Sequence, residues 1–204
     1  MNIETNRRQF IAGAGALTVG VALPGVKARA GVQASRFPLN PEKLASYISI
    51  NGDGSAVGWI GKVDMGQGTD IGWAQMIAEE LDLPVEKVSI VQGHTHETVD
   101  QGGASGSTGV WRAGAALRNA AAEARRTLLE MAATRLGVAA DRLTVNDGVV
   151  SVSGAAGKTA TYGELIGGKH FDVQMEWNKH YGNELLVKGK AKPKAASEYK
   201  IIGR

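Results

Sequence analysis

Cysteine is absent from the 204 residues of this chain. Without thiols the chain forms no disulfide, offers no thiolate nucleophile and holds neither zinc nor an iron–sulfur cluster through cysteine ligands. Long apolar runs are also missing, because the most apolar segment near the N-terminus is too short and too rich in glycine and alanine for a stable membrane span. These absences exclude disulfide scaffolds, cysteine catalysis and cysteine-ligated metal centres within this chain.

The chain also lacks a strong charge of either sign. Its formal net charge is +3, and much of the basic excess lies in the first 30 residues and in the tail after Lys188. The sequence therefore gives no reason to expect a nucleic-acid partner.

Residues 1–30 have the three parts of an export leader in the correct order. Arg7 and Arg8 precede a weakly apolar segment, and Ala28-Arg29-Ala30 has the small-x-small form of a cleavage site. The paired arginines match a twin-arginine signal, whose route exports folded proteins, commonly with a cofactor already inserted. We therefore expect a periplasmic protein. The alternative is a cytosolic protein with a chance Arg-Arg pair.

About 174 residues follow the leader, enough for one domain or two small lobes. Residues 31–44 contain two prolines and are expected to be an extended linker. Residues 45–187 hold the regular patterns of a folded domain. Residues 188–204 have the composition of a second linker, which we expect to lead toward a further domain.

The folded part opens with a β-hairpin that leads into a glycine-rich loop. Strands are predicted at residues 47–50 and 56–63, joined by an Asn-Gly-Asp-Gly turn. The second strand enters the first loop, residues 65–69 (Met-Gly-Gln-Gly-Thr), which precedes a predicted helix at 70–81 and a strand at 88–91. The pattern is a strand–helix–strand unit with the first loop at its corner.

The predicted helix has a capped start and two distinct sides. Thr69 or Asp70 is expected to cap it, and Glu79 and Glu80 are expected to face water. Its buried side is expected to consist of Ile71, Ala74, Gln75, Ile77, Ala78 and Leu81.

A second glycine-rich loop, residues 102–109 (Gly-Gly-Ala-Ser-Gly-Ser-Thr-Gly), leads into a long alanine-rich helix. This helix is predicted to start at residue 109 or 110 and to run to 136, where Gly137 stops it. Its small residues allow close approach to a sheet or another helix. Its solvated side is expected to carry Arg118, Arg125 and Arg126.

The remaining pattern completes an α+β (α/β-like) fold. A second hairpin is predicted over residues 143–152 around Asn146-Asp147-Gly148. Thr161 and Glu164 form a capping box for a short helix ending near Gly167. The whole is a strand–glycine loop–helix–strand unit with β-hairpins and a long alanine-rich helix.

Both glycine loops precede helices, where unpaired N–H groups attract anions and glycine lets the backbone approach a ligand closely. Gln67 and the hydroxyl residues Ser105, Ser107 and Thr108 add hydrogen-bonding groups that a plain turn does not need. Two such loops could hold two parts of one phosphate-bearing cofactor. The alternative is that both are ordinary strand-to-helix turns.

Several familiar chemistries are unsupported. The second loop lacks the lysine of a P-loop, Ser107 stands where a serine-hydrolase elbow needs glycine, and no G-x-G-x-x-G follows a strand. Residues 94–97 (His-Thr-His-Glu) alternate along an extended segment, so their side chains point in opposite directions. We interpret them as polar turn residues and predict no metal site of this chain's own.

At these residues the sequence resembles the molybdenum hydroxylases. The similarity covers residues 45–166, including both loops, the strand–helix–strand unit and the alanine-rich helix. It is closest to the periplasmic large subunits of the isoquinoline 1-oxidoreductase type, related to xanthine dehydrogenase and aldehyde oxidoreductase (aldehyde oxidase). The resemblance implies that residues 45–187 are part of a molybdopterin-binding domain.

The resemblance also implies a cofactor and a set of contacts. The cofactor is molybdopterin cytosine dinucleotide, with Gln67 bonded near the pterin and dithiolene, and Gly66 and Gly68 giving backbone access. The second loop would contact the pterin or pyrophosphate through Ala104, Ser105, Ser107 and Thr108. The family hydroxylates an N-heterocycle or aldehyde with water as the oxygen source. Electrons leave through an iron–sulfur small subunit, with a cytochrome c as a candidate acceptor.

One departure from the family pattern limits what this chain does alone. The catalytic carboxylate of the family lies in a Gly-Glu-Pro-type motif far downstream, and no such motif occurs in these 204 residues. We therefore expect no catalytic residue and no turnover from this chain without the remainder of the large subunit. The competing hypothesis is a non-enzymatic periplasmic α/β module that binds a small anion or assists assembly.

Overall fold

The computed structural model describes residues 39–155, 157–166 and 168–203. These residues lie within one compact unit, Arg36–Arg204. The predicted leader at residues 1–30 lies outside the described residues, as does most of the predicted linker at 31–44.

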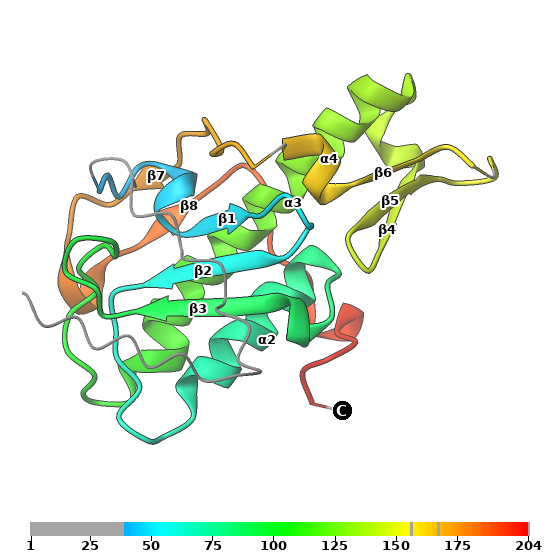
Figure 1. The fold of residues 1–204 in the computed structure, drawn as a ribbon. Helices are drawn as coiled ribbons and strands as arrows, with labels where there is room; N and C mark the ends of the chain where they lie inside the picture. Colours follow the sequence, from blue (N-terminus) through cyan, green and yellow to red (C-terminus); the bar gives the residue numbers. More distant parts are fainter. Residues whose placement is uncertain (1–38, 156, 167, 204) are drawn as a thin grey trace, which may run out of the picture. The chain divides into compact units, whose positions relative to one another are not determined.

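The central sheet confirms the predicted strand–helix–strand unit (Figure 1). Strand β1 (Ile48–Ile50) pairs antiparallel with β2 (Ala56–Ile60), and β2 pairs in parallel with β3 (Val88–Gln92). A parallel pair needs a crossover, which α2 (Thr69–Leu81) supplies. Strand β2 ends three residues earlier than predicted.

Helices α2 and α3 (Gly114–Leu136) lie on one face of this sheet (Figure 1). Glycine in β2 makes room for them, since a Cβ at Gly58 would meet side-chain atoms of Ile77 and Leu117. The alanines of α3 allow its close packing, as predicted. Those that are buried are Ala116, Ala120, Ala121, Ala122, Ala124 and Ala132.

A second sheet confirms the predicted hairpin and capping box. Strands β4 (Leu143–Asn146) and β5 (Val149–Val152) are joined by Asp147 and Gly148, both at positive φ as a type I′ turn requires. In the box, Thr161 N donates to Glu164 Oε2 at 2.8 Å, and Glu164 N donates to Thr161 Oγ1 at 3.2 Å.

The other elements of the described chain are β6 (Thr159–Thr161), α4 (Tyr162–Ile166), β7 (Glu176–Trp177), β8 (Val187–Lys188), the π-helix η3 (Gly109–Ala113), and the 3-10 helices η1 (Leu44–Ser46), η2 (Val85–Lys87), η4 (Ala140–Arg142), η5 (Gly182–Glu184) and η6 (Ala196–Glu198).

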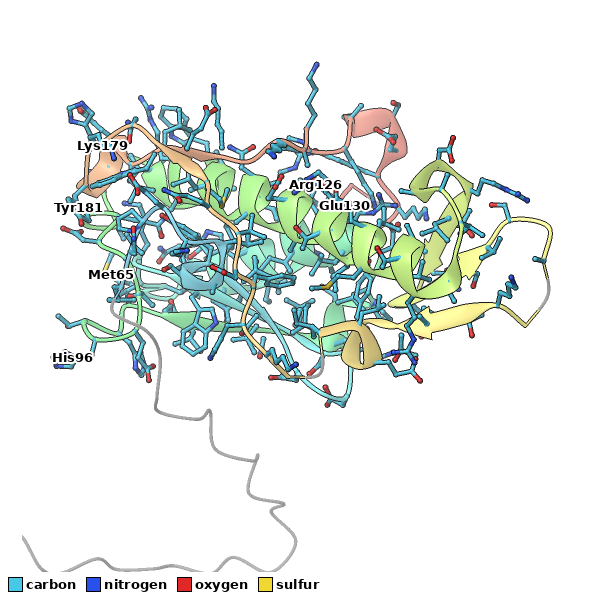
Figure 2. All side chains as sticks on the ribbon, turned by 90° about the horizontal axis from the view of Figure 1, so that it is seen from above. Met65, His96, Arg126, Glu130, Lys179 and Tyr181 are labelled. Atoms are coloured by element: carbon cyan, nitrogen blue, oxygen red, sulfur yellow. The ribbon has the colours of Figure 1, made fainter. Side chains whose placement is uncertain are left out.

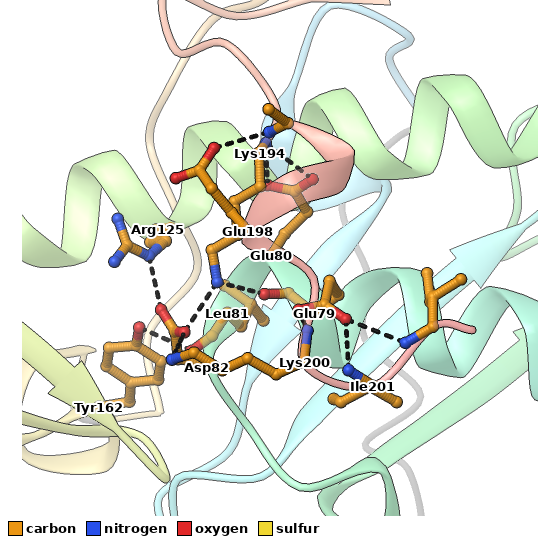
Figure 3. A network of polar contacts seen from close by, with 12 residues as sticks. Glu79, Glu80, Leu81, Asp82, Arg125, Tyr162, Lys194, Glu198, Lys200 and Ile201 are labelled. Atoms are coloured by element: carbon orange, nitrogen blue, oxygen red, sulfur yellow. Dashed lines mark hydrogen bonds and ion pairs between the residues drawn. The ribbon is translucent and has the colours of Figure 1, made fainter. Parts of the chain in front are cut away.

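The prediction of which side of α2 faces water is wrong. Glu79 and Glu80 are 2% and 1% exposed, whereas Ile71, predicted to be buried, is 62% exposed. The reason is tertiary: residues 188–202, which we term the strap, contact α3 first and then cover the last turn of α2, where Lys194 and Ile201 bond to the two glutamates (Figure 3). The prediction is confirmed for Ile77, Ala78 and Leu81, which are fully buried.

The strap is held by the buried carboxylates of α2. Backbone N–H groups of Lys200, Ile201 and Ile202 donate to the Glu79 carboxylate at 2.8, 2.8 and 3.1 Å. The Lys194 N–H donates to both oxygens of Glu80 at 3.1 Å. Three successive backbone N–H groups thus form a concave anion-binding site, and the anion that occupies it is the Glu79 carboxylate of the same chain.

Asp82 and the arginines of α3 extend this network. Arg118 Nε lies 2.7 Å from Glu80 Oε1, and Arg125 Nε lies 2.9 Å from Asp82 Oδ2. Lys194 Nζ lies 2.7 Å from Asp82 Oδ1. The two arginines are therefore half-buried in ion pairs, which corrects their predicted place on a solvated side of α3.

Candidate cofactor-binding site

The two glycine loops follow the carboxyl ends of the two parallel strands. The first loop leaves β2 and enters α2, and the second loop follows β3 and enters η3 and α3. Met65 and His96, which mark the connections after β2 and β3, lie at the same end of the molecule (Figure 2). Ligands of α/β sheets commonly bind at this edge.

Trp73 joins the two helix starts. Its indole is fully buried, and Nε1 donates to the Gly109 carbonyl at 3.1 Å. A Cβ on Gly109 would lie 3.5 Å from Thr69 Cγ2. The structure therefore brings the end of the first loop and the end of the second loop together.

Asp64 shapes the first loop. Its Oδ1 accepts the Gly66 N–H at 2.6 Å, while Oδ2 accepts the Thr69 N–H, the Thr69 hydroxyl at 2.9 Å and the Asp70 N–H at 3.3 Å. The predicted cap by Thr69 or Asp70 is thus corrected, because the N-cap residue is Gly68 and Asp64 accepts the first two N–H groups of α2. Asp70 bonds within the first turn, where its Oδ1 accepts the Ile71 N–H at 2.8 Å. The Gly66 N–H is the largest of the contacts that hold the pKa of Asp64 below its ordinary value.

The predicted contact residues of the first loop are exposed. Gly66 and Gly68 have φ of 105° and 74°, a conformation that favours glycine, and a Cβ on either would meet nothing within 4 Å. Gln67 Oε1 accepts the Met65 N–H at 2.8 Å, and its Nε2 has no acceptor in the described part of the chain. The loop therefore presents glycine backbone and one amide donor to the outside.

The second loop is a tight turn stabilised by its own groups. The Thr108 hydroxyl and N–H both donate to the Ser105 carbonyl, at 2.6 and 3.1 Å. Gly106 and Ser107 have φ of 56° and 57°, which for serine is an uncommon, strained conformation. Ser105 and Ser107 are exposed and Ala104 is partly exposed, so these predicted contacts lie on an accessible surface.

Two buried polar residues that contact the loop segments were not predicted from the sequence. Lys62 is 1% exposed, and its Nζ donates to the carbonyls of Gly103 at 2.7 Å and Gly102 at 3.3 Å. Gln101 is 2% exposed, and its Oε1 accepts the Gly61 N–H at 2.8 Å. Burial lowers the pKa of Lys62, and the nearby Asp100 charge opposes this effect. Because lysine is rarely buried, the residue type at position 62 does not predict a buried side chain.

The long helix begins with a π-helical turn rather than the regular turn that was predicted. Such turns are rare and often mark functional sites. Val110 and Trp111 on this turn are exposed, as are Met65 and Ile71 beside the first loop. Apolar side chains thus surround the polar loops.

Metal ligands do not converge in the described residues. His94 Nδ1 lies 3.2 Å from Glu97 Oε2, an exposed local pair. Within residues 39–155, 157–166 and 168–203, no group of three His, Asp or Glu side chains is placed to hold a metal ion. In the same residues, no helix is long and apolar enough to cross a membrane. The loop donors that have no acceptor in the described residues are the Gln67 side-chain amide, the N–H groups of Gly103 and Ala104, and the hydroxyls of Ser105 and Ser107. Such donors suit an anionic ligand.

A comparison with family models decides the family. The model of the molybdopterin cofactor-binding domain matches residues 2–201. The chain belongs to this family. The resemblance predicted from the two loops is therefore confirmed, as is the mixed α/β class of the domain.

Curated relatives agree with this assignment. One of the subunits of nicotinate dehydrogenase from Pseudomonas putida is 33% identical over 162 residues, which are 79% of this chain and 12% of that protein. The beta subunit of isoquinoline 1-oxidoreductase from Brevundimonas diminuta is 31% identical over 172 residues, which are 80% of this chain and 22% of that protein. The molybdopterin-binding domain described here thus spans less than a quarter of either relative.

A solved structure shares the fold. CO dehydrogenase from Oligotropha carboxidovorans is 32% identical to this chain, with a TM-score of 0.52 over 58% of this chain and 15% of that one. A structure of Cu,Mo-CO dehydrogenase gives the same values. The residues present here fit a molybdopterin cofactor, because the N–H groups of Gly103 and Ala104 and the Gln67 side-chain amide have no acceptor in the described residues and can donate to its anionic groups.

Proposed function

We propose that this chain is part of the molybdenum cofactor-binding subunit of a periplasmic oxidoreductase. The enzyme hydroxylates an N-heterocycle or an aldehyde, with water as the source of oxygen. The observation that carries the proposal is the pairing of the two glycine loops through Trp73 and Gly109 within a domain of this family. Nicotinate dehydrogenase and isoquinoline 1-oxidoreductase among the relatives support the choice of an N-heterocycle.

The cofactor in this proposal is molybdopterin cytosine dinucleotide, which supplies the redox-active molybdenum when bound. Gly66, Gln67 and Gly68 would hold the pterin end. Ala104, Ser105, Ser107 and Thr108 would hold the pterin or pyrophosphate through N–H groups and hydroxyls. The chain's own contribution is binding and orientation, since no buried carboxylate or histidine faces these loops in the described residues.

Three partners complete the proposed enzyme: the remainder of the large subunit, an iron–sulfur small subunit and a cytochrome c that accepts electrons. The proposal is tested by purifying the chain with the products of its neighbouring genes and measuring molybdenum and cytosine nucleotide per chain. Near-stoichiometric amounts of both are expected. Their absence from an intact complex would favour the module that binds a small anion or assists assembly.

Gln67→Ala tests the first loop within that complex. Loss of the amide leaves polar atoms of the cofactor unpaired, at about 1 to 3 kcal/mol per group, which corresponds to roughly 5- to 150-fold weaker binding. Molybdenum per chain should fall. The fold should persist, because Gln67 is exposed and its side chain bonds just the Met65 N–H among the residues that the structure describes. His94→Ala, at an exposed turn residue, is the control and should retain full molybdenum. Equal molybdenum in both variants would count against the contact.

Export through the twin-arginine route is tested at Arg7 and Arg8. Changing both to lysine should leave the protein in the cytoplasm, because the twin-arginine route requires the pair. Cell fractionation followed by immunoblotting measures the distribution. Undiminished delivery to the periplasm would refute the proposed route, and the cytosolic alternative is supported if the unaltered chain also stays in the cytoplasm.

A further inference from the structure

Lys62 lies at the base of the second loop and contacts three acceptors. Its Nζ is 2.7 Å from Gly103 O, 3.3 Å from Gly102 O and 2.5 Å from Asn183 Oδ1. A protonated lysine has three N–H donors and no acceptor, so this arrangement uses all of them. Lys62 therefore has no donor left for a ligand and acts through the groups that it holds.

The two loop carbonyls point at Lys62, and this fixes the direction of the next N–H groups. In a trans peptide the C=O of one residue and the N–H of the next point in opposite directions. The N–H groups of Gly103 and Ala104 must therefore point away from Lys62. Neither has an acceptor in the described residues, and a Cβ on Gly103 would meet nothing within 4 Å.

The surrounding contacts keep this arrangement in place. Asp100 accepts the Gly102 N–H through its side chain at 2.8 Å and the Gly182 N–H through its carbonyl at 3.1 Å. Gly182 precedes Asn183, the third acceptor of Lys62. A Cβ on Gly102 would lie 2.9 Å from Asn183 N, so only glycine fits there. The base of the loop is thus tied to the segment that follows β2 and to η5.

We propose that Lys62 is a positioning residue for the cofactor: its buried ammonium turns two loop carbonyls inward and so presents the N–H groups of Gly103 and Ala104 to the cofactor's pyrophosphate. The aligned peptide dipoles place their positive ends toward the ligand, and the lysine charge behind them adds to the same potential. The inference rests on the proposed function for the identity of the anion. It adds a residue that none of the loop motifs contains.

The direct test uses the unaltered full chain and inorganic pyrophosphate as the probe. Amide resonances of Gly103 and Ala104 should shift in a saturable manner during the titration, and their hydrogen exchange should slow at least tenfold at saturation. Amides of β4 and β5 in the second sheet should not respond. Absence of shifts and protection at Gly103 and Ala104 would overturn the proposal without any substitution.

Lys62→Met removes the charge and the donors while keeping a long side chain. It should weaken pyrophosphate binding at least tenfold and lower molybdenum per chain in the complex. Lys87→Met is the matched control, because Lys87 is exposed and its ion pair with Asp147 lies outside both loops, and it should change neither quantity. Pyrophosphate affinity within twofold of the unaltered chain in a folded Lys62→Met variant would overturn the proposal.

Lys62→Arg is the conservative variant and also serves if Lys62→Met fails to fold. Because arginine keeps the charge and several donors, it should restore at least part of the pyrophosphate affinity and of the amide protection. An arginine variant that folds without any such recovery would overturn the role of the buried cation. Molybdenum in the unaltered complex reports on the proposed function separately. Its absence alongside protected Gly103 and Ala104 would refute the molybdenum assignment and leave the role of Lys62 standing.

Discussion

Glu79→Ala is expected to lower the free energy of unfolding by about 3 kcal/mol or more, because each buried N–H group that loses its acceptor costs about 1 to 3 kcal/mol. Glu79 is 2% exposed, and its carboxylate accepts three backbone N–H groups from the strap. Truncation leaves those donors without their acceptor and leaves the cations of the same network with one anion fewer. Urea unfolding of the full chain, followed by circular dichroism, measures the change.

Glu86→Ala is the matched control for this prediction. Glu86 lies in η2, close to the end of α2, but its side chain is exposed and makes no hydrogen bond in the described residues. Its loss should change stability by less than about 0.5 kcal/mol. Equal urea midpoints for the two variants would mean that the strap contributes little to stability.

The same contacts set the acid sensitivity of the fold. Burial raises the pKa of Glu79, but the N–H groups of Lys200, Ile201 and Ile202 outweigh it and leave the pKa below its ordinary 4.5. A carboxyl group with a depressed folded-state pKa contributes stability that is present above about pH 4.5 and is lost as the pH falls through the folded-state value. Stability should therefore decline below pH 4.5, and the decline should be shallower in Glu79→Ala.

Trp73→Ala is the second large effect, expected to cost about 3 to 5 kcal/mol. The indole is fully buried between α2 and the start of the long helix, and it donates to the Gly109 carbonyl. Its removal leaves a cavity beneath both glycine loops, so cofactor binding should weaken together with stability. Urea unfolding measures the first effect and molybdenum per chain the second.

Trp111→Ala separates this effect from the general loss of a tryptophan. Trp111 is 56% exposed on the π-helical turn, so its truncation should cost less than about 1 kcal/mol. Trp73→Phe should fall between the two, because it keeps most of the ring volume but loses the bond to Gly109. Equal costs for Trp73→Ala and Trp111→Ala would show that Trp73 does not hold the two helices together.

Local chemistry was predictable from the sequence. Asp147-Gly148 has the conformational preference that a two-residue hairpin needs, and Gly137 ends the long helix at φ 69°. Thr161 and Glu164 are three residues apart and cap each other. In each case the interacting groups are close in sequence, so the local sequence pattern is enough to predict the contact.

Contacts between distant segments were not predictable. Glu79 has the pattern of a solvated helix residue until the strap, more than 120 residues later, covers it. Lys62 is buried because Gly103 and Asn183, at separations of 41 and 121 residues, supply its acceptors. Asp64 lies five residues before the first residue of α2, outside the usual N-cap position, so the sequence pattern favours Thr69 and Asp70 as caps instead. The contacts assigned to Gln67 and the second loop remain predictions.

The strap also sets an order of events during synthesis. Lys200 follows Glu79 by 121 residues, and a ribosome adds roughly 5 to 20 residues per second, so Glu79 is made about 6 to 25 s before its partner. During that interval the carboxylates of α2 remain hydrated, while the sheet side of the helix already has β2 and β3 to pack against. The nascent domain therefore passes through a stage in which only the sheet side of α2 is covered, and the strap covers the carboxylates of α2 later.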